Sequence, residues 1–132
     1  MVLAKSTMFV LVLLYAAYYD YKYRLIPDKV HIIIMILGLI NMNVLDSFSG
    51  LMVTTLPVLI IGIMRGGIGG GDIKLMGASS FFLGVSGGLY GTILGLLMAI
   101  VISGIDCLIY GKKVNRMPLA PYMALGYMMM LL

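Results

Sequence analysis

Apolar runs fill most of the chain, and short polar or glycine-rich connections separate them. Several of these runs fall short of the roughly 20 residues that a helix needs to cross the hydrocarbon core of a bilayer. We still expect each run to form a membrane helix, so the sequence predicts an all-α, polytopic integral membrane protein with six transmembrane helices. The six runs are Val2–Tyr19, Val30–Val44, Phe48–Met64, Ile73–Val85, Gly88–Tyr110 and Met117–Leu132.

The shortest of these runs, Ile73–Val85, directly follows Asp72 and a stretch that contains five glycines. Such a stretch gives a backbone that can turn sharply and let another part of the chain approach closely. Irregular backbone is tolerated at membrane depth only where protein or a water-filled cavity surrounds it. The pattern therefore indicates a site at Asp72. The five glycines are Gly66, Gly67, Gly69, Gly70 and Gly71.

Glycines recur at a four-residue spacing from just before the fifth run into it, at Gly87, Gly91 and Gly95. Small residues at that interval let helix backbones approach closely in lipid. We interpret this spacing as a sign of tight helix packing and not as a binding site.

The composition indicates whether water or lipid surrounds the folded chain. Of the 132 residues, 62% are hydrophobic and 11% are charged, whereas a soluble domain carries about a quarter charged residues. The polar surface is too small to cover a globule in water, so we expect a lipid bilayer around the protein. The net charge of +4 raises the question of nucleic acid, but the cations lie between the apolar runs and form no stripe. We expect no nucleic-acid partner.

The distribution of the cations predicts the orientation. Eight of the nine lie in the first, third and fifth connections or beside them, and Lys5 alone marks the amino-terminal side. Because cytoplasmic connections are rich in Lys and Arg, we expect both termini to face away from the cytoplasm. The first run resembles a signal peptide in its Ala16-Ala17 pair, but the bulky Tyr18 and Tyr19 favour a retained helix. The eight cations are Lys22, Arg24, Lys29, Arg65, Lys74, Lys112, Lys113 and Arg116.

Acids are costly inside a membrane bundle, so each of the five carboxylates needs an explanation. Asp28 follows Pro27 at the start of the second run, and we interpret it as a structural helix N-cap. Asp46 at the start of the third run has the same interpretation. Asp106 lies near the end of the fifth run, where we expect an ion pair with Lys112 or Arg116.

Asp72 and Asp20 are the candidates for chemistry. An N-cap would explain Asp72, but a cap does not require the glycine-rich stretch before it. Asp20 closes the first helix, where the negative end of the helix dipole disfavours a carboxylate. One helix runs towards the cytoplasm and the other leaves it, so both acids are expected at the same level near the cytoplasmic face. Such a pair can share a proton, as aspartic proteases do.

The sequence offers no metal site. Cys107 is the single cysteine and lies in an apolar run, so we expect it to pack as a small apolar residue. His31 is a lone imidazole without cysteine, glutamate or a second histidine nearby. We therefore predict no metal and no cofactor.

Three stretches of sequence resemble one family. "DYKYRLIPD" (Asp20–Asp28) resembles the first motif of the type IV prepilin leader peptidases, and "GGGDIKLMGA" (Gly69–Ala78) resembles their Gly-x-Gly-Asp motif. "PLAPYMALG" (Pro118–Gly126) is similar to the start of the last helix of the family. The resemblance spans nearly the whole chain and implies one membrane-embedded peptidase domain over residues 1–132.

The resemblance implies an aspartic endopeptidase in the cytoplasmic membrane. Such an enzyme cuts the basic leader from prepilins or pseudopilins at the cytoplasmic face, just before the apolar helix of the substrate. The two catalytic acids of the family correspond to Asp20 and Asp72. Gly69 and Gly71 correspond to the motif glycines, and Lys74 to the motif lysine. Pro27 belongs to the first motif.

The chain departs from the larger bacterial members of the family in one respect. Those members carry an insert with two Cys-x-x-Cys pairs that bind zinc and are linked to N-methylation of the product. The segment between Tyr23 and Pro27 has no room for that insert, and the chain resembles the short form found in tight-adherence pili and archaeal preflagellin peptidases. We expect no methyltransferase activity.

Two other functions fit parts of the sequence. A non-catalytic membrane subunit or an ion-conducting helical bundle would use Asp20, Asp72 and Asp106 to carry protons or cations. A protease of the signal-peptide-peptidase kind shares Gly-x-Gly-Asp and a Tyr-Asp pair, although Ile26-Pro27-Asp28 favours the prepilin group. The sequence leaves open whether the protein forms a homo-oligomer.

Overall fold

The computed structural model describes residues 2–40, 42–111 and 117–132, and within these ranges the only regular structure is helical. The all-α prediction is therefore confirmed for the part of the chain that is described. The helices are α1 (Val2–Tyr23), α2 (Asp28–Leu39), α3 (Val44–Arg65), α4 (Gly70–Tyr110) and α5 (Ala120–Leu131).

Three helices, α1, α3 and α4, are long and apolar enough to cross a membrane. Helices α2 and α5 contain 12 residues each and are therefore about 18 Å long, shorter than the hydrocarbon core. Both are shorter than the runs from which they were predicted, because α2 ends at Leu39 and α5 begins only at Ala120. Helix α1 instead continues beyond its run to Tyr23, which places Asp20 in its last turn.

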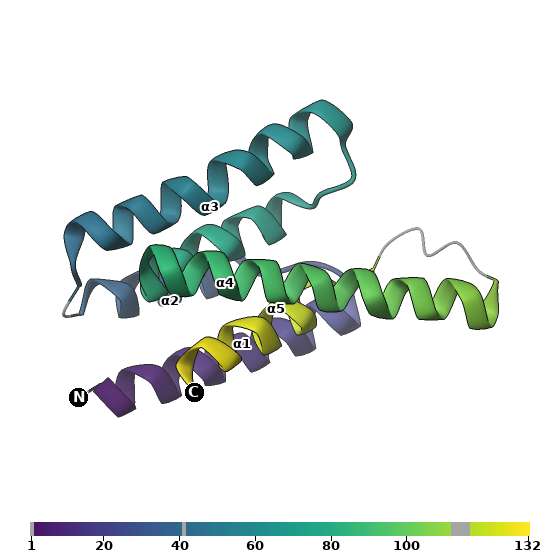
Figure 1. Ribbon diagram of the computed structural model, residues 1–132. Coiled ribbons are helices and arrows are strands. Elements are labelled where there is room, and N and C mark those ends of the chain that lie inside the picture. Colours follow the sequence, from purple (N-terminus) through teal and green to yellow (C-terminus); the bar gives the residue numbers. More distant parts are fainter. Residues whose placement is uncertain (1, 41, 112–116) are drawn as a thin grey trace.

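Helix α4 is folded back on itself at Gly84. Its 41 residues would extend about 62 Å as a straight rod, twice the hydrocarbon thickness. The backbone is non-helical at Gly84, with φ of 83°. A Cβ atom on Gly88 would lie 2.5 Å from the hydroxyl of Ser80, although eight residues span about 12 Å of straight helix. Residues 70–83 and 85–110 therefore run back along each other (Figure 1).

The break at Gly84 falls one residue before the predicted end of the fourth run, and Asp46 explains its position. The backbone N–H of Val85, at the start of the second part of α4, donates to Asp46 Oδ1 at 3.2 Å. The prediction that Asp46 caps its own helix is wrong, because the N-cap of α3 is Asn43 without a side-chain bond. Asp46 instead caps a neighbouring helix, where the chain turns and exposes an unpaired donor.

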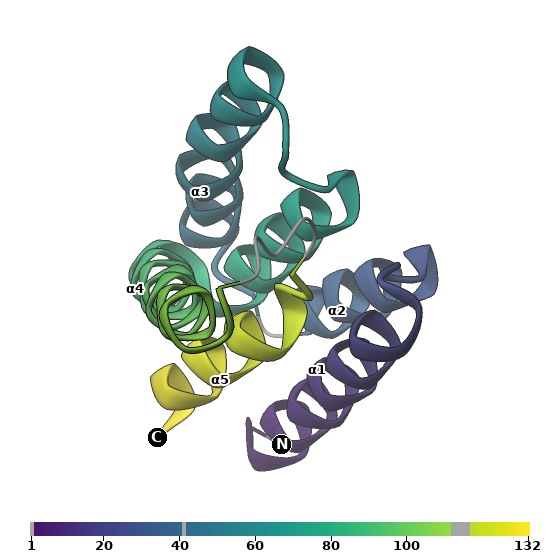
Figure 2. The same cartoon turned by 90° about the vertical axis from the view of Figure 1, so that its right-hand side faces the viewer.

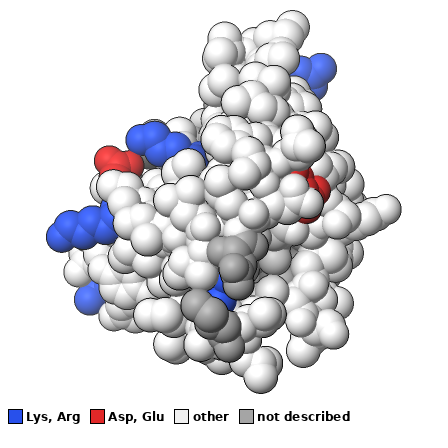
Figure 3. All heavy atoms as spheres, turned by 90° about the vertical axis from the view of Figure 1, so that its left-hand side faces the viewer, with Lys and Arg blue, Asp and Glu red and all other residues white. Residues whose placement is uncertain are grey.

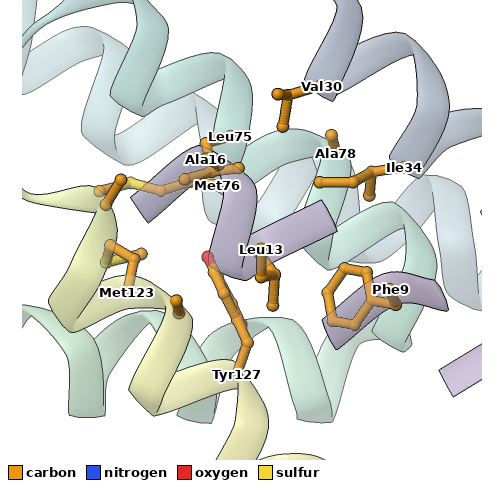
Figure 4. Packing of buried hydrophobic residues seen from close by; sticks show 12 residues of the cluster. Phe9, Leu13, Ala16, Val30, Ile34, Leu75, Met76, Ala78, Met123 and Tyr127 are labelled. Carbon is orange, nitrogen blue, oxygen red and sulfur yellow. The ribbon is translucent and has the colours of Figure 1, made fainter. Parts of the chain in front are cut away.

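The core lies where α1, α2, α4 and α5 meet. Phe9 of α1 stacks on Phe82 of α4 with ring centroids 4.1 Å apart. Tyr127 of α5 is fully buried, and its hydroxyl shares a 2.7 Å hydrogen bond with Thr92. Figure 4 shows Tyr127 and Phe9 with other buried side chains of this cluster.

Helix α5 lies between α1 and the second part of α4, and α3 packs on the outer side of α4 (Figure 2). A Cβ atom on Gly126 would lie 2.7 Å from the backbone nitrogen of Gly95 and would also contact the carbonyl of Gly91. The prediction of tight packing at Gly91 and Gly95 is confirmed, because the backbones of α4 and α5 touch there. This contact sets the position of α5, whose first residue reaches the candidate site.

The prediction that Cys107 packs as a small apolar residue in the interior is wrong, because this residue is exposed. The last turns of α4 extend past the rest of the bundle (Figure 1). Their large apolar side chains are exposed as well, Leu108 at 88% and Ile109 at 67%. An apolar run in a membrane protein does not distinguish a side chain that faces lipid from one that faces protein.

The hairpin in α4 makes Gly84→Ala a destabilising change. A Cβ at this backbone conformation, which is essentially restricted to glycine, adds about 1–3 kcal/mol of strain and collides with the Asp46 carboxylate. We expect a clear loss of thermal stability in detergent micelles. Gly104→Ala is the matched control, because a Cβ at Gly104 has nothing within 4 Å. Equal melting temperatures for the two variants would contradict the hairpin.

Candidate active site

Asp20 is held against the start of α5. Its side chain is 5% exposed, and its Oδ2 accepts a 2.9 Å hydrogen bond from the backbone N–H of Ala120. Helix α5 has no side-chain cap of its own, so Asp20 satisfies one of its free donors from across the bundle. The positive end of the α5 dipole also favours the carboxylate. The sequence showed no structural reason for Asp20, and this contact supplies one.

Asp72 lies in the first turn of α4, and the backbone before it leaves room for its carboxylate. The N-cap of α4 is Gly69, so Asp72 itself is not the cap. A Cβ on Gly69 would lie 3.1 Å from Asp72 Oδ2. Gly66 and Gly67 have positive φ values of 68° and 87°, which only glycine adopts without strain. The glycine-rich stretch therefore forms the turn after α3 and also leaves space for the carboxylate of Asp72.

The two sequence motifs touch each other. A Cβ on Gly71 would lie 3.4 Å from Ile26 Cβ, so the connection between α1 and α2 packs against the start of α4. Nearby, Lys74 Nζ lies 3.1 Å from Asp28 Oδ1. The prediction that Asp28 is an N-cap is wrong, because Pro27 occupies that position and no side-chain cap bond is present. Asp28 is the first residue of α2 and forms an ion pair with the motif lysine.

The two acids lie at the same level on α1 and α4. Phe9 stacks on Phe82, and the two helices run in opposite directions from this contact (Figure 1). Asp20 lies eleven residues after Phe9 in α1, and Asp72 lies ten residues before Phe82 in α4. These separations correspond to about 16 Å and about 15 Å of helix. Both acids therefore lie at about the same distance along the helices from the stack of Phe9 on Phe82.

The other candidate residues lie apart from this pair or have no contact that links them to it. Asp106 is half-buried in α4, and its expected partners Lys112 and Arg116 lie outside the described residues. His31 is buried, and neither ring nitrogen has a hydrogen-bond partner among the described residues. Within the same residues, no three side chains of His, Cys, Asp or Glu come together as a metal site would require. The arrangement is thus a carboxylate pair beside a glycine-rich turn.

Sequence reasoning missed Ile26 and Ala120, which hold the acids through their backbone or aliphatic atoms. Ile26 packs on Gly71 beside Asp72, and the N–H of Ala120 binds Asp20. The only sequence signal for either was its place inside a motif, Ile26 before Pro27 and Ala120 between two prolines. The side-chain chemistry of an isoleucine or an alanine does not indicate a functional role.

The type IV leader peptidase family model matches residues 7–106. The chain belongs to this family. The match includes both acids and the two touching motifs, and it stops before α5, so the resemblance of residues 118–126 to the last family helix is not covered. No curated protein and no solved structure matches the chain. A leader peptidase of this family is a protease, and the apolar helices of this member are those of a membrane protein.

The hydrogen bond between Asp20 and Ala120 predicts that Asp20→Ala and Asp20→Asn differ in stability. Alanine leaves a buried N–H unpaired, which costs about 1–3 kcal/mol, whereas the asparagine oxygen still accepts. We expect a lower melting temperature in detergent for Asp20→Ala alone. Asp72→Ala is the control, since none of the side-chain hydrogen bonds among the described residues involves Asp72. If Asp20→Ala melts like the unaltered protein, the capping role is wrong.

Proposed function

We propose that this member of the family is an aspartic endopeptidase that removes the basic leader from prepilins or pseudopilins, with Asp20 and Asp72 as its catalytic acids. The main support is their common level at the point where the two motifs touch. Both acids are surrounded by features that an ordinary helix end does not need. Asp20 accepts a hydrogen bond from the first residue of another helix, α5. Asp72 lies beside a turn that is lined by glycines.

The proposed reaction uses the two acids in complementary protonation states. One carboxylate, ionised, accepts a proton from the attacking water, and the other, neutral, donates a hydrogen bond to the scissile carbonyl. The tetrahedral intermediate then collapses, the C–N bond breaks, and the departing amine takes up a proton. The pair is restored with one proton shared between its members. One oxygen of Asp20 already binds Ala120, which leaves the other for the proton transfer.

We further propose six membrane crossings, with residues 70–83 and 85–110 of α4 counted separately. Both termini then lie on the side away from the cytoplasm, and the site lies near the cytoplasmic face of the inner membrane. The connections around the acids carry Lys22, Arg24, Lys29 and Arg65, as cytoplasmic connections do. The opposite end of the bundle supports this orientation. Its surface carries few charged side chains, mostly near the edge of the view (Figure 3).

An ion-conducting bundle is the main alternative, and the positions of the acids disfavour it. A relay needs polar groups at successive depths. Asp20, Asp28 and Asp72 lie at one end of the helices, and Asp46 lies at the other end beside the α4 hairpin. Asp106, the third acid of this alternative, lies four residues before the end of α4, whose last turns extend past the rest of the bundle (Figure 1).

Replacing either acid by asparagine should abolish cleavage of a synthetic leader substrate, with a rate loss of at least about 10²–10⁴-fold. Asparagine keeps the size of the side chain but cannot ionise. The Asp20→Asn, Asp72→Asn double variant should be scarcely slower than either single one, because the two acids act as a unit. The rate of the unaltered enzyme should follow a bell-shaped pH profile.

Asp46→Asn is the matched control for these variants, since it keeps an acceptor for Val85 and lies at the other end of the bundle. It should cleave at the rate of the unaltered enzyme. The substrate panel should hold a prepilin and a single-pass signal peptide, so that a signal-peptide-peptidase activity is also detected. Full activity in either single acid variant would rule out the proposed mechanism.

The proposed orientation predicts opposite results for two reporter fusions. A reporter that is active only outside the cytoplasm should be active after Leu132. The same reporter inserted after Gly66, between α3 and α4, should be inactive. The reverse pattern would place the acids at the outer face and contradict the proposed location of cleavage.

A further inference from the structure

The helices that carry the two acids meet through side chains of the buried core. Phe9 of α1 stacks on Phe82 of α4, about 15 Å along the helices from the acids, and Ala16 of α1 belongs to the same buried cluster as Leu75 and Met76 of α4. The backbones of α1 and α4 have few direct contacts, and each helix packs instead against α2 and α5. A direct link between the start of α4 and the end of α1 would therefore add to the packing through these helices.

The short connection from α1 to α2 supplies that link. It follows Asp20 by one helical turn, and its Ile26 packs against Gly71, the residue before Asp72. Immediately after it, Asp28 pairs with Lys74, two residues beyond Asp72. Gly71 and Lys74 are three residues apart and so share a face of α4. Asp72 lies between them and points to a different side of the helix.

We propose that the ion pair between Asp28 and Lys74 is a positioning contact that holds Asp72 in reach of Asp20. This inference rests on the proposed function, because it assumes that the acids act together. Lys74 and Asp28 are positioning residues, and neither touches the reacting atoms. Their side chains are 62% and 75% exposed, so the pair can open and close. An exposed pair of this kind changes an equilibrium by at most about fivefold.

A crosslink measures this link without any substrate. The 3.4 Å between Ile26 Cβ and the Cβ position of Gly71 is close to the Cβ–Cβ distance of a disulfide, about 3.5–4.5 Å. The full chain with Ile26→Cys, Gly71→Cys and Cys107→Ser, which removes the lone thiol, should form the disulfide on mild oxidation. The rate of its formation reports how often the two segments meet.

Adding Lys74→Gln or Asp28→Asn to this background should slow disulfide formation by about two- to fivefold. Lys74→Arg should retain the rate, because it keeps the charge. The exchanged pair, Asp28→Lys with Lys74→Asp, should recover most of it. Equal rates in all of these variants, or an exchanged pair as slow as the single variants, would overturn the proposal.

The kinetics of cleavage separate positioning from substrate binding. If the pair positions Asp72, Lys74→Gln lowers kcat by about two- to fivefold and leaves KM unchanged. Oxidation of the Ile26→Cys, Gly71→Cys variant that carries Lys74→Gln should then raise kcat, and a reductant should reverse the gain. A rise in KM alone would mean that Lys74 contacts the substrate, and it would overturn the positioning role.

The two proposals fail separately. If the unaltered chain cleaves no prepilin, the proposed function is wrong, and the crosslinking rates still decide whether the ion pair links the two segments. If cleavage requires Asp20 and Asp72 but the crosslinking rates do not respond to charge, the proposed function stands and the positioning contact is wrong.

Discussion

An unpaired N–H at the start of a helix is costly in lipid, where no water can accept from it. Two carboxylates of this chain satisfy such groups in helices other than their own. Asp20 of α1 accepts from Ala120 at the start of α5, and Asp46 of α3 accepts from Val85 after the break in α4. These bonds fix the arrangement of the bundle, because each ties a helix start to a different helix. The acid pair exists in its present place because one of its members is also a cap.

This double use of Asp20 has a consequence for chemistry. A carboxylate that is already held by a backbone donor keeps a fixed direction, and preorganised groups of this kind are what acid–base catalysis needs. Asp72 is held differently. Its surroundings are glycine backbone with room for the carboxylate, and its position depends on the contacts of Gly71 with Ile26 and of Lys74 with Asp28. One acid is thus anchored directly, and the other is placed by its neighbours.

The glycines of the chain serve three distinct physical purposes. Gly66 and Gly67 provide the positive φ values of the turn before α4, and Gly84 provides the one at its hairpin. Gly69 leaves space for a carboxylate, and Gly95 lets the backbone of α5 approach that of α4. A spacing pattern in the sequence indicated only the last of these. The glycine-rich stretch before Asp72 indicated the turn at Gly66 and Gly67. The roles of Gly84 and Gly69 depend on which residue lies opposite, and the sequence does not contain that information.

Local chemistry was sufficient to predict the helices, the lipid surroundings and the family from the sequence. Hydropathy determines where helices form, and the motifs around Asp20 and Asp72 are contiguous in the chain, so both could be recognised without a structure. The roles of Asp28, Asp46 and Cys107 could not, because an N-cap, an ion pair and a lipid-facing position look alike in one dimension. Only the tertiary structure decided that Asp28 meets Lys74, that Asp46 caps residues 85–110 and that Asp20 caps α5. The reason is that these partners are 39 to 100 residues away along the chain, and only the packing of the helices brings them together.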